Sequence, residues 1–282
     1  MVSPNRKKHN TIKGVLLIVI FMMALFPFIF ISETEVLISE HTIENRPKTE
    51  SSKQVVIEKP LHDVQLPDFI SIKDIPTRKQ QFFDFLKPAI DAENTKLAKR
   101  RAKIIAISLV LNEQQELTKK QHKVLAKYAK KYKLKNTSSS TVIVEQLLLR
   151  IDQIPRELVL VQAANESAWG SSRFARIGLN FFGMWCFKKD CGLVPRGRDS
   201  GLNHEVAAFD DLEQMVNHYF HNINTNPAYD LFRTIRGQLR DNGVELRPDV
   251  LATGLLPYSE RGMDYIVEIN TMLRHNHKYI KA

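Results

Sequence analysis

The sequence predicts a mainly α-helical protein with a small β element, preceded by an N-terminal membrane helix. Three observations carry this prediction. Apolar residues recur at mostly helical spacing from residue 75 onward. Strand signals are sparse, and the best of them lies around Val206 to Phe209. An uncharged apolar run extends from Gly14 to Ile31 near the start of the chain.

The apolar run at residues 14–31 is at the short end of what crosses a bilayer as a helix. Residues 1–13 before it carry several basic side chains, and a positive flank is typical of the cytoplasmic side. A cleaved signal peptide has a shorter apolar core and small residues at its cleavage site, whereas bulky residues continue here up to Ser32. We therefore expect an uncleaved single-pass anchor that exports the rest of the chain. A cleaved signal peptide and a buried soluble helix are the alternatives.

The overall charge favours an anionic partner. The chain has 41 Lys and Arg against 31 Asp and Glu, which gives a formal net charge of +10. This balance suits nucleic acid, lipid headgroups or the carboxylate-bearing peptides of a cell wall. Export argues against nucleic acid, so membranes and cell walls remain.

The two cysteines, Cys186 and Cys191, favour a disulfide. They are the only cysteines in the chain and lie close together. An isolated pair in an exported protein is typical of a short-loop disulfide, with two free thiols as the alternative. A metal site would need further ligands beside them, and His218 and His221 lack a third ligand on their helix face. We expect no metal and no cofactor.

Composition divides the exported part into three segments. Residues 32–70 are rich in Glu, Ser, Lys and Pro and predict a flexible linker. Residues 71–139 predict a helical N-terminal segment, in which Pro88 interrupts the first helix and Thr118 caps a later, lysine-rich helix. Residues 140–282 predict the main domain.

One helix of the main domain carries a candidate acid. Pro155 suits its first turn and Gly170 its end. Steps of four residues place Leu158, Gln162 and Glu166 on one apolar face. Burial and the negative end of the helix dipole both disfavour the carboxylate anion of Glu166 and raise its pKa. A carboxylic acid that stays protonated near neutral pH can donate a proton to a glycosidic oxygen.

The alternative for Glu166 is a structural role, in which its carboxylate reaches out of the core to an arginine such as Arg173. The local pattern of residues supports both hypotheses equally.

Two motifs favour catalysis. Residues 162–172 read Gln-Ala-Ala-Asn-Glu-Ser-Ala-Trp-Gly-Ser-Ser, and residues 180–185 read Asn-Phe-Phe-Gly-Met-Trp. Together they resemble the signature of the bacterial endo-β-N-acetylglucosaminidases, a family that includes autolysins and the muramidase domain of the flagellar rod protein. The resemblance covers about residues 140–280. It implies a lysozyme-like domain with a groove and a small β-hairpin lobe, and peptidoglycan glycan strands as the substrate. Together with the predicted anchor, it leads us to expect a bacterial inner-membrane protein whose catalytic domain lies in the periplasm.

The resemblance also implies roles for single residues. Glu166 takes the family's acid position, and residues 180–183 match a stretch that borders the groove. The predicted substrate-binding residues are Gln162, Trp169, Asn180, Phe182, Trp185 and Tyr258. Trp185 and Cys186 replace the family's more usual small or basic residues, so the resemblance does not define the shape of this side of the groove. Tyr265 is expected in the core.

A second carboxylate is needed across the sugar if the protein supplies a base or a nucleophile. The family's candidate lies in the β lobe just before an apolar strand, and Glu205 fits that description. Asp199, Asp210 and Asp211 are rivals. Assistance by the substrate's own N-acetyl group would remove the need for a second carboxylate.

Three functions remain open at this point. The first is an endo-β-N-acetylglucosaminidase with Glu166 as general acid. The second is a lytic transglycosylase, which the absence of a Gly-Leu-Met-Gln-like motif disfavours. The third is a non-catalytic protein that binds the cell wall, which the intact run from Glu166 to Gly170 disfavours.

Overall fold

The structure is a computed structural model that describes residues 58–134, 139–198 and 201–281. All of these residues belong to one compact unit, Val56–Ala282. The predicted basic flank and membrane anchor lie outside the described residues, and so do residues 32–57 of the predicted linker. Among the helices that the structure describes, none is both long and apolar enough to cross a bilayer.

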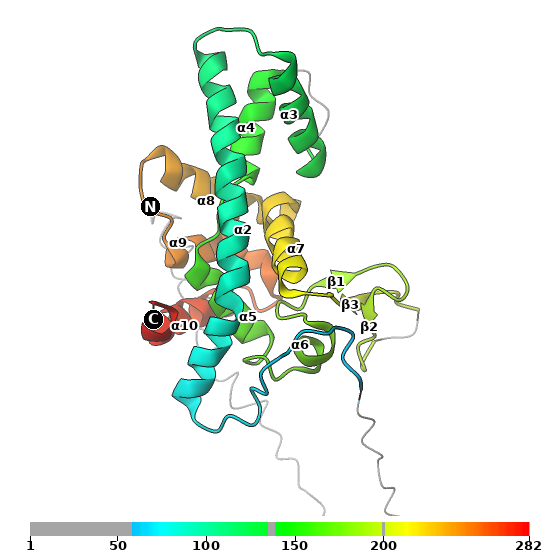
Figure 1. Ribbon diagram of the computed structural model, residues 1–282. Coiled ribbons are helices and arrows are strands. Elements are labelled where there is room, and N and C mark those ends of the chain that lie inside the picture. The colour runs from blue at the N-terminus through cyan, green and yellow to red at the C-terminus, as the bar shows by residue number, and fades with distance from the viewer. Residues whose placement is uncertain (1–57, 135–138, 199–200, 282) are drawn as a thin grey trace, which may run out of the picture. The chain divides into compact units, whose positions relative to one another are not determined.

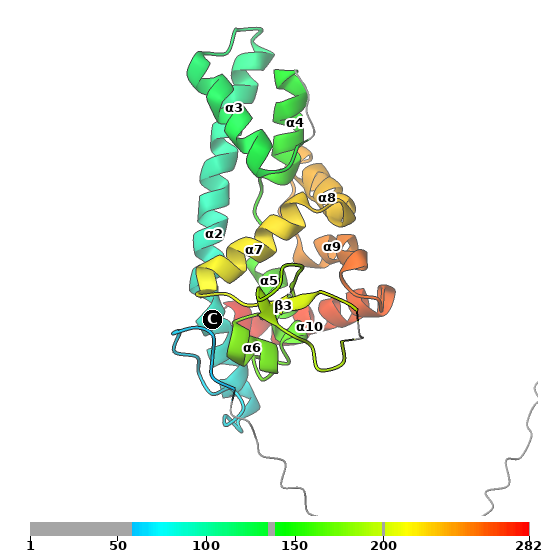
Figure 2. The ribbon, with the colours of Figure 1, turned by 90° about the vertical axis from the view of Figure 1, so that its right-hand side faces the viewer.

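A single long helix, α2 (Ile75–Asn112), extends from the level of α6 and the β strands to the level of α3 and α4 (Figures 1 and 2). Asp74 caps it by accepting a hydrogen bond from the backbone N–H of Thr77. The predicted interruption at Pro88 is wrong, because the helix continues through this residue. Leu86 and Ile90 on either side of Pro88 are fully buried, and this packing outweighs the roughly 3 kcal/mol that an interior proline costs a helix.

The buried helix α5 (Arg156–Glu166) packs on α2, α9 and α10. Before it lie α3 (Lys119–Lys131) and α4 (Ser140–Arg150), and after it α6 (Arg173–Gly178). Thr118 and Gln121 form a capping box that confirms the predicted start of α3. Towards the C-terminus follow α7 (Leu212–Thr225), the 3-10 helix η1 (Pro227–Tyr229), α8 (Asp230–Asp241), α9 (Pro248–Ala252), the 3-10 helix η2 (Thr253–Tyr258) and α10 (Met263–Lys281).

The β element is a small antiparallel sheet of three strands in the order β1-β3-β2. Its strands are β1 (Trp185–Cys186), β2 (Gly192–Leu193) and β3 (Glu205–Ala207). Val206 is the register partner of both Trp185 and Leu193. The sheet and the helices together confirm a mainly α fold with a small β element.

Residues 58–70 differ from the predicted linker, since they lie against the domain. Leu61 donates its backbone N–H to the carbonyl of Ile177 at 2.8 Å. Phe69 is only 2% exposed and packs edge-on against Phe82 of α2. A Cβ at Gly170 would lie 2.4 Å from the Phe69 ring, so glycine is required there for this close approach. Burial of the Phe69 side chain stabilises the ordered conformation of this segment, even though many of its residues are polar.

Candidate active site

Glu166 is the last residue of α5, four positions before the predicted helix end at Gly170. The hydroxyl of Ser167 donates to the carbonyl of Ala163 and accepts from the backbone N–H of Gly170, which closes the turn after the helix. Ala168, Trp169 and Gly170 then all have positive φ angles, of 50°, 58° and 76°. The turn leaves the half-buried Glu166 carboxyl group at the negative end of the α5 dipole.

The surroundings of Glu166 raise its pKa above the ordinary value. Burial is the largest cause, and it outweighs the Tyr265 hydroxyl and the Asn165 amide, which both favour the anion. The Asn165 side chain lies 3.4 Å from one carboxyl oxygen. Arg261 lowers the pKa and Glu268 raises it, while these two residues form an ion pair with each other at 2.5 Å. The direction of the shift is the one that a general acid requires.

The alternative pairing of Glu166 with Arg173 is wrong. Arg173 forms a two-pronged ion pair with Glu58, one contact of which measures 2.8 Å, and it is not a hydrogen-bond partner of Glu166.

Tyrosines gather around Glu166. Burial raises the pKa of each of them, and the charge of Glu166 adds to the rise; within the described residues they are Tyr219, Tyr229, Tyr258 and Tyr265. The rings of Tyr258 and Tyr265 stack with their centres 5.7 Å apart. These neutral phenols provide a polar but poorly solvated environment for the carboxyl group.

Gln162 connects two of these tyrosines and is completely buried. Its side-chain N–H donates to the Tyr265 hydroxyl at 2.9 Å, and its oxygen accepts from the Tyr219 hydroxyl at 2.5 Å. Gln162 therefore contacts the residues that surround the acid.

The Asn180–Gly183 stretch lies beside Glu166, and the side chain of Asn180 holds it in place. This buried amide donates to the carbonyls of Met184 and Ala207 and accepts from the N–H groups of Phe182 and Met184. Gly183 has a φ of +64°, and a Cβ there would lie 3.9 Å from a carboxyl oxygen of Glu166. Asn180 thus positions the stretch from inside, whereas Gly183 lies next to the acid.

Phe182 is buried and stacks on Tyr219 with ring centres 4.0 Å apart. Its carbonyl accepts the hydroxyl hydrogen bond of Tyr258 at 2.9 Å. The structure therefore brings Phe182 and Tyr258 into one cluster with Tyr219, in which Phe182 contributes packing and Tyr258 remains partly exposed.

The two tryptophans lie in different surroundings. Trp169 packs against Phe82 and Phe83 of α2, at centroid distances of 5.6 and 5.3 Å. Its contacts are thus with the core. Trp185 is 54% exposed and stacks flat on His204 with ring centres 4.2 Å apart. Of the two indoles, the more exposed one offers a surface on which a sugar ring could stack.

Glu205 is only 5% exposed, and its carboxylate oxygens accept the backbone N–H groups of Asp190 and Gly192 at 3.1 and 2.9 Å. The adjacent Cys186 and Cys191 form the predicted disulfide. Their sulfur atoms lie close to the Glu205 carboxylate, but they are bonded to each other and are not thiolate ligands for a metal. In this arrangement the carboxylate of Glu205 holds the loop between β1 and β2.

Comparison with known proteins identifies the family of this chain. Residues 143–276 match the model of the glucosaminidase family, described as mannosyl-glycoprotein endo-beta-N-acetylglucosaminidase. Protein bax of Escherichia coli (strain K12) is 30% identical over 270 residues, which cover 92% of this chain and 95% of that protein. The chain belongs to the glucosaminidase family. No solved structure matches it, and the lysozyme-like arrangement stays a prediction.

The rival carboxylates of this member of the glucosaminidase family have local roles or lie outside the described residues. Asp211 caps α7 by accepting from the backbone N–H of Gln214 at 2.7 Å. Asp210 accepts from the Gln214 side chain at 3.2 Å. Asp199 is not among the described residues.

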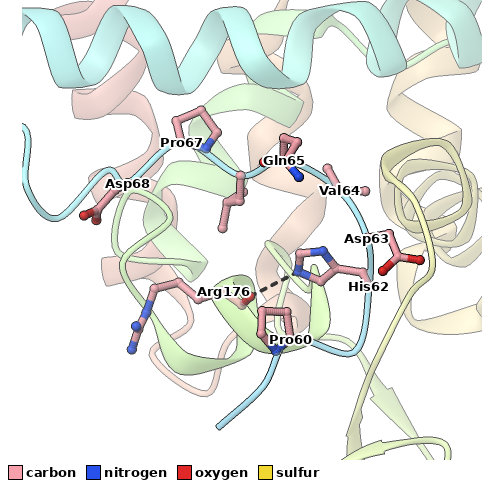
Figure 3. Close-up of a pocket in the computed structure, with 9 residues that line it drawn as sticks. Pro60, His62, Asp63, Val64, Gln65, Pro67, Asp68 and Arg176 are labelled. Atoms are coloured by element: carbon pink, nitrogen blue, oxygen red, sulfur yellow. Dashed lines mark hydrogen bonds between the residues drawn. The ribbon is translucent and has the colours of Figure 1, made fainter. Parts of the chain in front are cut away.

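A hollow of about 530 Å³ lies between residues 60–68 and α6 (Figure 3). His62 points across it and hydrogen-bonds to the carbonyl of Arg176 at 3.1 Å. None of the predicted site residues lines this hollow, so it is separate from the Glu166 site.

The sequence did not predict several neighbours of Glu166. Tyr219, Tyr229, Arg261 and Glu268 all interact with its charge. Tyr265 was expected in the core and is fully buried there, and the charge of Glu166 also raises its pKa. The three-residue spacing of Tyr265 and Glu268 on α10 was the one local signal that both share a helix face.

Proposed function

We propose that this glucosaminidase is a peptidoglycan hydrolase, an endo-β-N-acetylglucosaminidase that cleaves β-1,4-glycosidic bonds on the reducing side of N-acetylglucosamine. The observation that carries the proposal is the Glu166 carboxyl group, half-buried at the end of α5 with a raised pKa. Membership of the glucosaminidase family supports a glycosidic substrate. The net charge of +10 suits a wall whose peptides carry carboxylates.

In the proposed reaction, protonated Glu166 donates its proton to the glycosidic oxygen as the bond from that oxygen to the anomeric carbon breaks. Glu166 is left as a carboxylate, and the anomeric carbon carries the developing positive charge. Water then supplies the hydroxyl group of the new reducing end, and the remaining proton of that water ultimately restores the protonated Glu166. The hydroxyl of Tyr265 and the positive charge of Arg261 favour the carboxylate that forms in the first step.

The group that stabilises the anomeric carbon is a separate question. Glu205 is our proposed second carboxylate, acting as base or nucleophile. To act, it would have to release the N–H groups of Asp190 and Gly192. Assistance by the substrate's N-acetyl group is the alternative that leaves both hydrogen bonds intact.

We also propose that the enzyme works in the periplasm, anchored in the bacterial inner membrane by residues 14–31. The proposal rests on the apolar composition of that run and on the basic residues before it. Export is also consistent with the Cys186–Cys191 disulfide.

Mass spectrometry of the fragments released from purified sacculi tests the activity. We expect fragments with N-acetylglucosamine at their reducing ends, and we expect none above background from a Glu166→Gln variant prepared in the same way. Anhydro-muramyl ends would instead identify a lytic transglycosylase. Absence of any products from the wild-type chain would favour a non-catalytic wall-binding protein.

A further inference from the structure

Three side chains from three helices form a buried chain of hydrogen bonds that ends at Tyr265, a neighbour of Glu166. Tyr219 comes from α7, Gln162 from α5 and Tyr265 from α10, and all three are completely buried. The Tyr219–Gln162 contact measures 2.5 Å and the Gln162–Tyr265 contact 2.9 Å. Tyr265 in turn lies close enough to the Glu166 carboxyl group for the two to interact: its hydroxyl lowers the pKa of Glu166, and the charge of Glu166 raises the pKa of Tyr265.

The chemistry of these groups gives the chain a direction. The oxygen of the Gln162 side chain accepts the proton of the Tyr219 hydroxyl, so the nitrogen end of the amide must face Tyr265. An amide N–H can only donate, and the Tyr265 oxygen is therefore the acceptor in that contact. A tyrosine hydroxyl carries a single proton, which leaves the proton of Tyr265 available for Glu166.

Without the Tyr219 hydroxyl, no other group in this row of hydrogen bonds would hold the Gln162 amide in that orientation. A reversed amide would present its oxygen to Tyr265, and Tyr265 would then donate to Gln162 instead of Glu166. The ring of Tyr219 is already packed by its stack on Phe182, so packing alone does not require the hydroxyl.

We propose that Tyr219 and Gln162 are positioning residues that aim the hydroxyl proton of Tyr265 at Glu166 and so stabilise the carboxylate that remains after Glu166 has donated its proton. The inference rests on the proposed role of Glu166 as general acid. It assigns a function in the reaction to two residues that do not touch the carboxyl group through a hydrogen bond of their own.

Other groups also face Glu166 and form the background of the pH dependence. Asn165 belongs to the same helix, Tyr229 to η1 and Tyr258 to η2, while Arg261 precedes α10 and Glu268 lies on it. The test must therefore remove single hydroxyl groups and leave these charges in place. Tyr→Phe substitutions do so.

The experiment measures kcat/KM of the full chain against pH for wild type, Tyr265→Phe, Tyr219→Phe and the double variant. Activity requires protonated Glu166, so it falls as the pH rises through the pKa of that group. Tyr265→Phe removes a donor that favours the anion, and we expect the falling limb to move to higher pH with about a tenfold loss at the optimum. Tyr219→Phe should move the limb in the same direction, with about a threefold loss, because the amide becomes free to reverse.

The double variant distinguishes an effect of Tyr219 that acts through Tyr265 from two independent packing effects of the substitutions. If Tyr219 acts through Tyr265, Tyr219→Phe has no further effect on the limb in the Tyr265→Phe background. The proposal would be overturned if the shifts of the two single variants added up in the double variant, or if Tyr219→Phe left the falling limb unchanged. Tyr219→Phe is the mild member of the set and keeps the test decisive if Tyr265→Phe unfolds.

Two controls complete the design. Tyr132→Phe removes a buried hydroxyl that lies next to Arg100, outside this chain of hydrogen bonds, and should leave the limb unchanged. Glu166→Gln tests the proposed function separately from the positioning role of Tyr219 and Gln162. An active Glu166→Gln enzyme would contradict the proposed function itself. An inactive Glu166→Gln enzyme, combined with unchanged falling limbs in the tyrosine variants, would contradict only the positioning role.

Discussion

Glu205 lies opposite Cys186 in the β1–β3 ladder, and its carboxylate binds the loop that the Cys186–Cys191 disulfide closes. The oxygens accept from the N–H groups of Asp190 and Gly192, on either side of Cys191. A covalent bond and a buried carboxylate therefore hold the same loop of the β lobe. Any catalytic role of Glu205 has to be measured against this structural one.

Glu205→Gln tests the second carboxylate. We expect this variant to lose most of its turnover on sacculi and, since an amide group must face one of the backbone N–H groups, to lose about 1–3 kcal/mol of stability. Turnover is measured well below the unfolding midpoint, so that loss of fold does not enter the rate. The matched control is Asp211→Asn, which keeps an oxygen that can cap α7 and should retain its turnover. A mild effect in both variants would favour assistance by the N-acetyl group.

Cys186→Ser tests the disulfide. In the intact protein the bridged form should be two hydrogens lighter than the reduced form by mass spectrometry. Loss of this short-loop bridge should cost about 2 kcal/mol in the free energy of unfolding. Because Glu205 holds the same loop, the losses from Cys186→Ser and Glu205→Gln should differ from additivity by at least about 0.5 kcal/mol. Strict additivity in denaturant titrations would show that the two constraints are independent.

Glu166→Gln tests the general acid. The variant keeps the shape of the side chain and removes the transferable proton, so lysis of sacculi should fall by roughly 10²–10⁴-fold. The amide also avoids the cost of ionising a half-buried group, and the variant should be at least as stable as wild type near neutral pH. Glu157→Gln, in the first turn of the same helix, serves as the control with normal activity. Full activity in Glu166→Gln would contradict the assignment.

Arg261→Gln tests the electrostatic setting of the acid. The positive charge of Arg261 lowers the pKa of Glu166, so its removal should raise that pKa. Since the acid must be protonated to donate, the falling limb of the pH–activity profile should move to higher pH. Arg261 is mostly exposed and its effect is screened by salt, so the shift should shrink at high ionic strength. A shift to lower pH would contradict the sign of this interaction.

Asn180→Asp tests the support of the stretch beside Glu166. The introduced carboxylate would keep acceptors for the N–H groups of Phe182 and Met184, but it would turn oxygen atoms toward the carbonyls of Met184 and Ala207. We expect a loss of roughly 2–4 kcal/mol in the free energy of unfolding, because buried acceptors are left without donors. Unchanged stability in thermal or denaturant unfolding would show that the amide network is dispensable.

Local features of the sequence were sufficient for part of this description. The helix N-cap at Thr118, the apolar face that carries Glu166 and the short-loop pairing of Cys186 with Cys191 depend on residues close together in the chain. Hydrogen bonding, helical periodicity and loop length act over a few residues, so their outcome can be predicted without the fold. The family motifs added the role of Glu166 by resemblance.

Tertiary packing decided the rest. It keeps α2 helical through Pro88, packs residues 58–70 against the domain and places Trp169 against α2. It also assembled Tyr219, Gln162 and Tyr265, whose contacts span 57 and 103 residues of sequence. Burial against distant elements stabilises these arrangements by more free energy than an unfavourable local propensity costs. No short window of sequence contains both partners of such a contact. The surroundings that shift the pKa of Glu166 therefore exist only in the folded chain.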